Sequence, residues 1–296
     1  MAARAFRSGF LLCCLALAAG CSSTTFFYNR LDFILPWYID DYANLNRQQK
    51  RHLDELLDPF LQWHRTRELP CYLLVLDEVE TTLDRELTAQ DIAALSLEFE
   101  KAWQRVEAEA LGWAIELGER LSDEQMTEFL AELEERQREL REEYLERDDA
   151  EVAEDSYDRM ADTAEDYLGR LQPEQRGILR TSSERLRRID ADWLAQRRVF
   201  LDRLAVVLER EPGWQSRLRA LVAARDEQLS PGYVAALDHN LALLQETAAK
   251  VLNARSERQD RHLRRRLSGV RGDVRKLVAQ AEEGVETGCR AAPVSV

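Results

Sequence analysis

The stretch "IAALSLEFEKAWQRVEAEALGWAIEL", residues 92–117, decides the fold class of this chain. Its apolar and small residues recur at alternating intervals of four and three, which places them on one face of an α-helix. Similar spacing returns twice further along, and no comparable segment alternates with a period of two. We therefore predict an all-α fold, an elongated multi-helix bundle of about eight helices with no sheet. The three stripes are Ile92, Ser96, Phe99, Trp103, Val106, Ala110, Trp113 and Leu117; Ala153, Tyr157, Met160, Ala164, Tyr167 and Leu171; and Leu186, Ile189, Trp193, Phe200, Leu204 and Val207.

A short repeated pattern indicates where the helices begin. Residues 45–49, 87–91 and 121–125 each place a leucine, a cap residue, two spacers and then a carboxamide or acid. The cap side chain can accept a hydrogen bond from the first helical turn while the last side chain reaches back, which forms a capping box. Residues 171–175 and 229–231 are looser copies. The pattern is also similar to the Leu-Thr-x-x-Gln motif of Spy-type periplasmic chaperones, but helix capping is our preferred interpretation.

The amino-terminal residues resemble a bacterial lipoprotein signal. Arg4 and Arg7 give a positive start, residues 10–19 are apolar, and small residues directly precede Cys21. The apolar run is shorter than the roughly 20 residues that a membrane-spanning helix needs. The ending resembles the lipobox, in which the cysteine sulfur receives diacylglycerol and the chain is cut before it. We predict a signal peptide over residues 1–20 and lipidation at Cys21; an ordinary secretory signal cut nearby is the alternative.

The residues around the lipobox also predict a location. Leu17 stands one place earlier than the leucine of most lipoboxes, and Ser22 resembles the pattern that sends Gram-negative lipoproteins to the outer membrane. No second apolar stretch is long enough to cross a bilayer, so the lipid is the expected membrane attachment. We predict a protein held in the cell envelope, at the periplasmic face of the outer membrane.

Aromatic residues crowd together directly after this anchor. Residues 21–46 are interpreted as anchor, tether and aromatic segment, 47–288 as the helical domain and 289–296 as a tail. The rings can rest at the level of the lipid headgroups, or they can pack back as the first core segment of the domain. Packing into the domain is our preferred interpretation. The aromatic residues are Phe26, Phe27, Tyr28, Phe33, Trp37, Tyr38 and Tyr42.

Charge and cysteine content restrict the class of protein further. The formal net charge of −14 argues against a general nucleic-acid binder, which needs a basic surface. Once the signal has left and Cys21 is acylated, Cys71 and Cys289 remain. We hypothesise a disulfide between them, as suits an oxidising compartment; the alternative is that Cys71 fills a small apolar site and Cys289 lies in a disordered tail.

Strings in the first third of the mature chain resemble an uncharacterised family of helical bacterial envelope lipoproteins. They are residues 27–32 (FYNRLD), 36–42 (PWYIDDY), 63–65 (WHR) and 68–72 (ELPCY). The resemblance implies an all-helical envelope lipoprotein and names no activity. Cys71 stands where the pattern of the family leads us to expect a charged residue.

The sequence contains no established catalytic motif. It has no Gly-x-Ser-x-Gly elbow, phosphate-binding glycine loop, Cys-x-x-Cys pair or His-Glu-x-x-His. A di-iron bundle needs Glu-x-x-His, and no histidine here has a glutamate three residues before it. We interpret His64, between Trp63 and Arg65, as a hydrogen-bonded structural residue. No catalytic residue, metal site or cofactor is predicted.

Two blocks of charge stand out. Residues 148–166 hold nine acids and one opposing arginine, with an expected helix break at Asp148 and Asp149. A basic block follows near the carboxyl end, with its first arginines spaced to share one helical face that suits anionic lipid or an acidic partner. Our preferred interpretation is a solvated face or internal pairing with the acidic block. The arginines of this basic face are Arg255, Arg258, Arg261, Arg264, Arg265 and Arg266.

These observations favour a lipid-anchored periplasmic protein without enzymatic activity. We expect a binding or scaffold module of the envelope, attached to the membrane by its amino-terminal lipid, with an envelope protein as its partner. The alternatives are a Spy-like holdase, which would show an exposed concave apolar surface with basic rims, and a hydrolase of envelope polymers. A polar cleft that joins His64 to carboxylates from another helix would favour the hydrolase.

Overall fold

The protein is all-α, as the apolar spacing predicts. The computed structural model describes residues 23–227, 229–281 and 289, in which every regular element is helical and no strand occurs. The predicted signal peptide and Cys21 lie outside the described residues. The elements are α2 (Ser23–Tyr28), α3 (Leu31–Ala43), α4 (Arg47–Trp63), a π-helical turn η1 (His64–Glu68), α5 (Leu69–Thr82), α6 (Ala89–Gly118), α7 (Asp123–Leu145), α8 (Asp149–Leu168), α9 (Pro173–Ser183), α10 (Asp190–Val207), α11 (Trp214–Ala223), α12 (Pro231–Asn253) and α13 (Glu257–Ala279).

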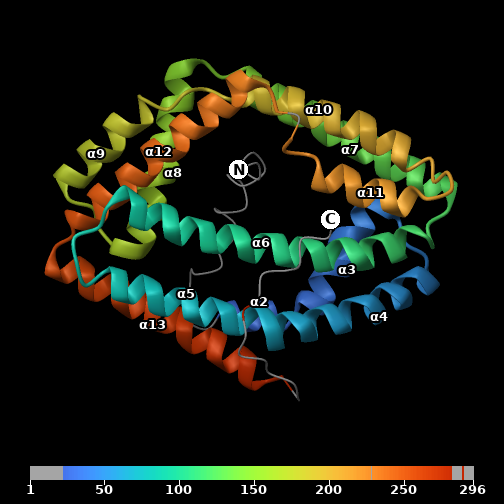
Figure 1. Ribbon diagram of the computed structural model, residues 1–296, viewed down its shortest axis with the longest axis horizontal. Helices are drawn as coiled ribbons and strands as arrows, with labels where there is room; N and C mark the ends of the chain where they lie inside the picture. Colours follow the sequence, from blue (N-terminus) through green and yellow to red (C-terminus); the bar gives the residue numbers. More distant parts are fainter. Residues whose placement is uncertain (1–22, 228, 282–288, 290–296) are drawn as a thin grey trace.

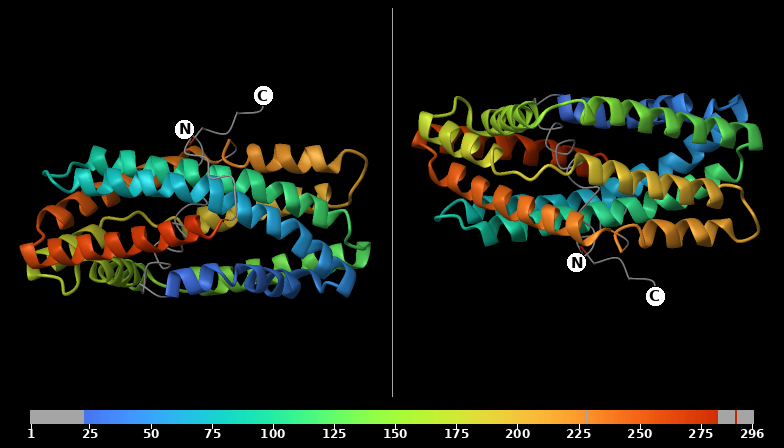
Figure 2. Two further views of the ribbon diagram at one scale, coloured as in Figure 1. Left: turned by 90° about the horizontal axis from the view of Figure 1, so that it is seen from below. Right: turned by 90° about the horizontal axis from the view of Figure 1, so that it is seen from above.

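The helices are arranged around an elongated, flattened ring, along which the chain reverses direction so that α10 lies beside α7 and α13 beside α5 (Figure 1). The two edge-on views show α3, α7 and α8 in one layer and α6 and α11 in the other (Figure 2). Within the described residues, the buried apolar side chains form four clusters instead of one central core. The described helices are more numerous than expected because several segments are short and separated by capped junctions.

Two of the predicted stripes differ in how well they describe the packed faces. The stripe that begins on α8 packs as expected, because Tyr157 and Met160 are partly buried against the largest cluster and Leu171, just after that helix, is buried in it. On α6 the stripe is wrong in its middle, where Phe99 is 45% exposed. That helix contacts α4, α5 and α12 along its length. Its packed face there passes through Ala102, which is buried.

Capping boxes form at the helix starts that the repeated pattern predicts. They begin α4 at Asn46, α6 at Thr88 and α7 at Ser122. The expected break in the acidic block is also present, because Asp148 caps α8 through its side chain. A further box at Ser256 begins α13 and went unnoticed in the sequence, since it lacks the preceding leucine.

The carboxamides of these boxes also join helices to each other. Gln49 and Gln125 exchange side-chain hydrogen bonds of 2.7 and 2.9 Å, which brings the starts of α4 and α7 together. Gln259 donates to Gln175 at 2.9 Å and joins the starts of α13 and α9 in the same way. Each carboxamide therefore closes its own helix start and locks a junction between two helices.

Most of the aromatic rings of α2 and α3 do not pack into the domain, in contrast to our preferred interpretation. α3 directs Leu35, Ile39 and Ala43 into a core cluster with α4. The opposite side of α2 and α3 carries most of the aromatic rings, so packing into the domain is wrong for them. The exposed rings belong to Phe26, Phe27, Phe33, Trp37 and Tyr38.

A disulfide joins Cys71, near the start of α5, to Cys289, with the two Cα atoms 5.5 Å apart. The sulfur of Cys71 is buried among the residues of α5, whereas Cys289 is exposed. The bond closes a loop of 218 residues and fixes Cys289 against the helix that follows the π-helical turn.

Candidate functional site

A single π-helical turn, His64–Glu68, connects α4 to α5. Pro70 lacks the N–H that would continue the α-helical ladder at that point, and the N–H of Leu69 bonds to the carbonyl of His64, five residues back. A π-turn contains one residue more than an α-turn and therefore changes the direction in which neighbouring side chains point. The side chains of this turn contact α2, α5 and α6.

The imidazole of His64 lies between two tyrosines from different helices. Tyr28 of α2 bonds to Nδ1 at 2.9 Å, and Tyr72 of α5 bonds to Nε2 at 3.3 Å. The rings of Trp63, Tyr28 and Tyr72 surround it, with centroids 5.6 to 6.2 Å away. A neutral imidazole has one donor and one acceptor, so one tyrosine accepts a hydrogen bond and the other donates one.

Burial holds this histidine in its neutral form. Burial, reinforced by the positive charge of Arg65, lowers the pKa of His64 to about 4. Burial also raises the pKa of Tyr28 to about 12, against the opposing effect of Arg65. The guanidinium of Arg65 lies 5.3 Å from the Tyr28 ring centroid and donates to Asn29 at 3.0 Å. At neutral pH the cluster is an uncharged hydrogen-bonded chain beside one cation.

Glu68 ends the π-turn and forms an ion pair with Arg105 of α6. The carboxylate is 1% exposed and accepts two hydrogen bonds, 2.8 Å from Nε and 2.6 Å from Nη2. These bonds raise the pKa of Arg105. The fork geometry fixes the distance and angle between the π-turn and α6.

A groove of about 420 Å³ opens beside this cluster, between α4 and the junction of α2 and α3. It contains two carboxylates, Asp32 and Asp58, and neither is in an ion pair among the residues that the structure describes. The groove thus offers negative charge next to one arginine that already donates to Asn29. Its lining residues are Tyr28, Asn29, Asp32, Asp58, Pro59, Leu61, Gln62 and Arg65.

The groove brings together strings that are far apart in the sequence. Tyr28, Asn29 and Asp32 come from the first string, and Arg65 comes from the third. Sequence reasoning identified these strings and the hydrogen-bonded state of His64, but it missed their convergence. It also missed the Glu68 pair, for which the only signal was a carboxylate beside an apolar run.

The basic face is largely engaged within the protein, although not with the acids that we expected. Arg264 of α13 and Arg255, just before that helix, both bond to Asp260 of α13 at 2.8 Å. Arg264 also pairs with Asp84 at 2.9 Å, after α5. Arg261 has a longer contact of 3.5 Å with Glu257. Pairing with residues 148–166 is therefore wrong for these arginines, because closer acids lie on α13 itself and at the end of α5.

The remaining arginines of the basic face lie in different surroundings. Arg258 and Arg265 are exposed, and neither is in an ion pair among the residues that the structure describes. Arg266 is half-buried. Burial raises the pKa of Tyr167 on α8, and the positive charge of Arg266 opposes that rise. The six arginines do not form one free cationic surface.

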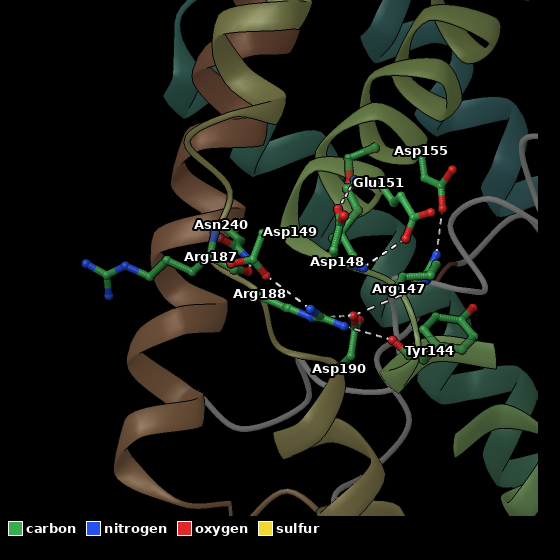
Figure 3. Close-up of polar contacts among 12 residues, drawn as sticks. Tyr144, Arg147, Asp148, Asp149, Glu151, Asp155, Arg187, Arg188, Asp190 and Asn240 are labelled. Carbon is green, nitrogen blue, oxygen red and sulfur yellow. Dashed lines mark hydrogen bonds and ion pairs between the residues drawn. The ribbon is translucent and has the colours of Figure 1, made fainter. Parts of the chain in front are cut away.

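The acidic block forms ion pairs in two places: Glu154 and Glu165 pair with arginines of α9, and other members pair with arginines at the junction of α7, α8 and α10. Arg147 bonds to Asp155 at 2.7 Å, and Arg188 bonds to Asp149 at 3.0 Å and to Asp190 at 3.2 Å. Figure 3 shows these groups meeting around Asp190, while the side chain of Arg187 points away. Every member of this network already has a protein partner, so we interpret it as a structural junction.

The described residues hold neither a metal-binding cluster nor a membrane-spanning helix. Among residues 23–227, 229–281 and 289, no group of histidine, cysteine or acidic side chains is arranged to hold a metal ion. Over the same part of the chain, no helix combines the length and apolar character needed to span a bilayer.

The chain belongs to DUF6279, a family of unknown function whose model matches residues 41–234. The match includes the π-turn and Glu68 but begins after most of the aromatic segment. No curated protein and no solved structure matches the chain.

Proposed function

We propose that this chain is a lipoprotein anchored through Cys21 in the outer membrane, where it serves as a non-enzymatic binding or scaffold module at the periplasmic face. The single observation that carries this proposal is the groove beside α2, the first described helix after the lipobox. Its position would place a binding surface close to the anchor.

The chemistry of the groove favours binding over catalysis. Both ring nitrogens of His64 are bonded to tyrosines, and His64 is not among the residues that line the groove. The expected sign of a hydrolase was a cleft that joins this histidine to carboxylates, whereas Asp32 and Asp58 lie in the groove without it. A general base must reach its substrate, and an imidazole whose two nitrogens are both hydrogen-bonded to tyrosines does not reach one.

The unpaired carboxylates suggest the kind of partner. Asp32 and Asp58 would be matched by a lysine or arginine side chain from an envelope protein. The capping pattern shared with Spy-type chaperones has a structural role at the helix junctions here, so it does not favour the holdase alternative.

Site-directed photocrosslinking in intact cells tests this proposal. A photoreactive residue at exposed position 54, one turn before Asp58 on α4, should crosslink a specific envelope protein. The Asp32→Asn/Asp58→Asn variant should weaken that crosslink several-fold. A photoreactive residue at exposed position Asp158, on α8, is the matched control probe. A crosslink that is equally strong in the neutralised groove would contradict the proposed site.

A further inference from the structure

The aromatic rings of α2 and α3 form an exposed surface where a folded domain usually presents polar groups. On α3 the exposed aromatics include Phe33 and Trp37, four residues apart and therefore on one side of the helix. The exposed fractions are 52% for Phe26, 51% for Phe27, 73% for Phe33, 64% for Trp37 and 54% for Tyr38. We call these five side chains the aromatic face.

The outward direction of this face is fixed by the packing of the opposite side. Leu35, Ile39 and Ala43 fill a core cluster with α4, so α3 cannot rotate its rings inward without exposing them. The large apolar residues that are exposed on other described helices are spread over α5, α6, α7, α10 and α12, and Phe99 is the one aromatic ring among them. A concentration of exposed aromatic rings on two consecutive helices is typical of an interaction site.

The position of the face in the chain favours a bilayer as its partner. Two peptide steps, at most about 7 Å, separate Cys21 from Ser23, and three helical steps, about 4.5 Å, separate Ser23 from Phe26. The polar headgroup layer on each side of a bilayer is roughly 5–8 Å thick. If Cys21 carries lipid, Phe26 therefore lies within or directly above that layer.

The composition of the face fits the interface between water and lipid. Tryptophan and tyrosine are enriched at headgroup level, where one end of the ring is apolar and the other is wet. The guanidinium of Arg30 lies over the Phe26 ring, 4.3 Å from its centroid, so the face carries a positive charge that suits lipid phosphates. Asp40 pairs with Lys50, and Asp41 is exposed, so the carboxyl end of α3 is polar.

We infer that the aromatic face lies in the headgroup region of the membrane, with the amino-terminal end of α3 deeper than its carboxyl-terminal end. The inference rests on the proposed lipidation of Cys21 and adds an orientation to it. The domain then rests on the bilayer along α2 and α3 instead of hanging from a flexible tether. The groove that shares Tyr28 and Asn29 opens beside the membrane surface, and its partner binds there.

Fluorescence quenching with the mature protein tests this orientation. Protein extracted from membranes is reconstituted into phosphatidylethanolamine–phosphatidylglycerol vesicles with or without brominated acyl chains. Brominated lipid should quench part of the tryptophan emission, and Trp37→Phe should remove most of that quenching. Trp193→Phe, on α10 against Tyr144, should leave it unchanged.

A second pair of variants separates membrane contact from folding. In Phe26→Ser/Phe33→Ser the quenching should fall at least twofold, whereas Leu97→Ser/Phe99→Ser should match the parent protein. Vesicle flotation without quenching of Trp37 overturns the orientation while leaving the anchor intact. Failure to float overturns the anchor and the orientation together. Crosslinked dimers that are lost in the Phe33 variant, without bromine quenching, would instead assign the face to a second copy of the chain.

Discussion

Replacing Arg105 with methionine should destabilise the protein strongly, because it leaves the carboxylate of Glu68 buried without a counter-charge. Glu68 is 1% exposed, and both of its oxygens accept hydrogen bonds from that guanidinium. Removal of one partner of a buried ion pair costs about 3–5 kcal/mol, since the remaining charge keeps its desolvation penalty. The π-turn would also lose its contact with α6.

The assay is urea unfolding followed by far-ultraviolet circular dichroism, with two comparison variants. Arg136→Met removes an exposed arginine that bonds to Glu132 at 3.0 Å and Glu139 at 3.2 Å, and should cost far less stability than Arg105→Met because solvent screens an exposed pair. Glu68→Gln/Arg105→Met removes both charges and should recover most of the loss. An Arg105→Met protein that is no less stable than Arg136→Met would refute the assignment of this pair as the link between the π-turn and α6.

Three further predictions concern stability. Because the pKa of folded His64 is about 4, below its ordinary value of 6.5, the unfolded chain binds more protons between these values, so the free energy of unfolding should fall as pH drops from about 6.5 to 4. His64→Gln should flatten this slope, which reaches at most roughly 1.4 kcal/mol per pH unit, and an unchanged slope in pH-dependent urea titrations would count against the buried imidazole. Cys71→Ser/Cys289→Ser should lower the free energy of unfolding by up to about 5 kcal/mol in the loop-entropy model, and peptide mapping without reductant should recover the linked peptides from the parent protein. Ser122→Ala should cost roughly 1 kcal/mol in thermal unfolding because its hydroxyl caps α7; identical melting curves would show that the cap contributes nothing.

Local patterns in the sequence predicted the helices and many of their starts. The capping residues Asn46, Thr88 and Ser122 act within one turn, so their effect is readable without knowledge of the fold. The all-α class follows from apolar spacing for the same reason. The spacing of apolar residues does not predict the angle at which a helix packs against several neighbouring helices. Phe99 is exposed because α6 packs against different helices along its length.

The site depends on long-range contacts that no local pattern encodes. Tyr28 and His64 are 36 residues apart, and Glu68 and Arg105 are 37 apart. Pro70 interrupts the backbone hydrogen bonds of the helix at the π-turn, which is a local effect. The π-turn then directs these side chains toward distant helices, which the local sequence does not reveal. The basic face shows the same limit, since Asp84 approaches Arg264 from an element 180 residues earlier.

Mass spectrometry of the mature amino terminus is the decisive measurement for the lipid anchor. Protein isolated from envelope membranes should begin at Cys21 and carry acyl chains on that residue. An unmodified terminus at another residue would contradict the lipid anchor, and with it the proposed place of this protein at the membrane surface.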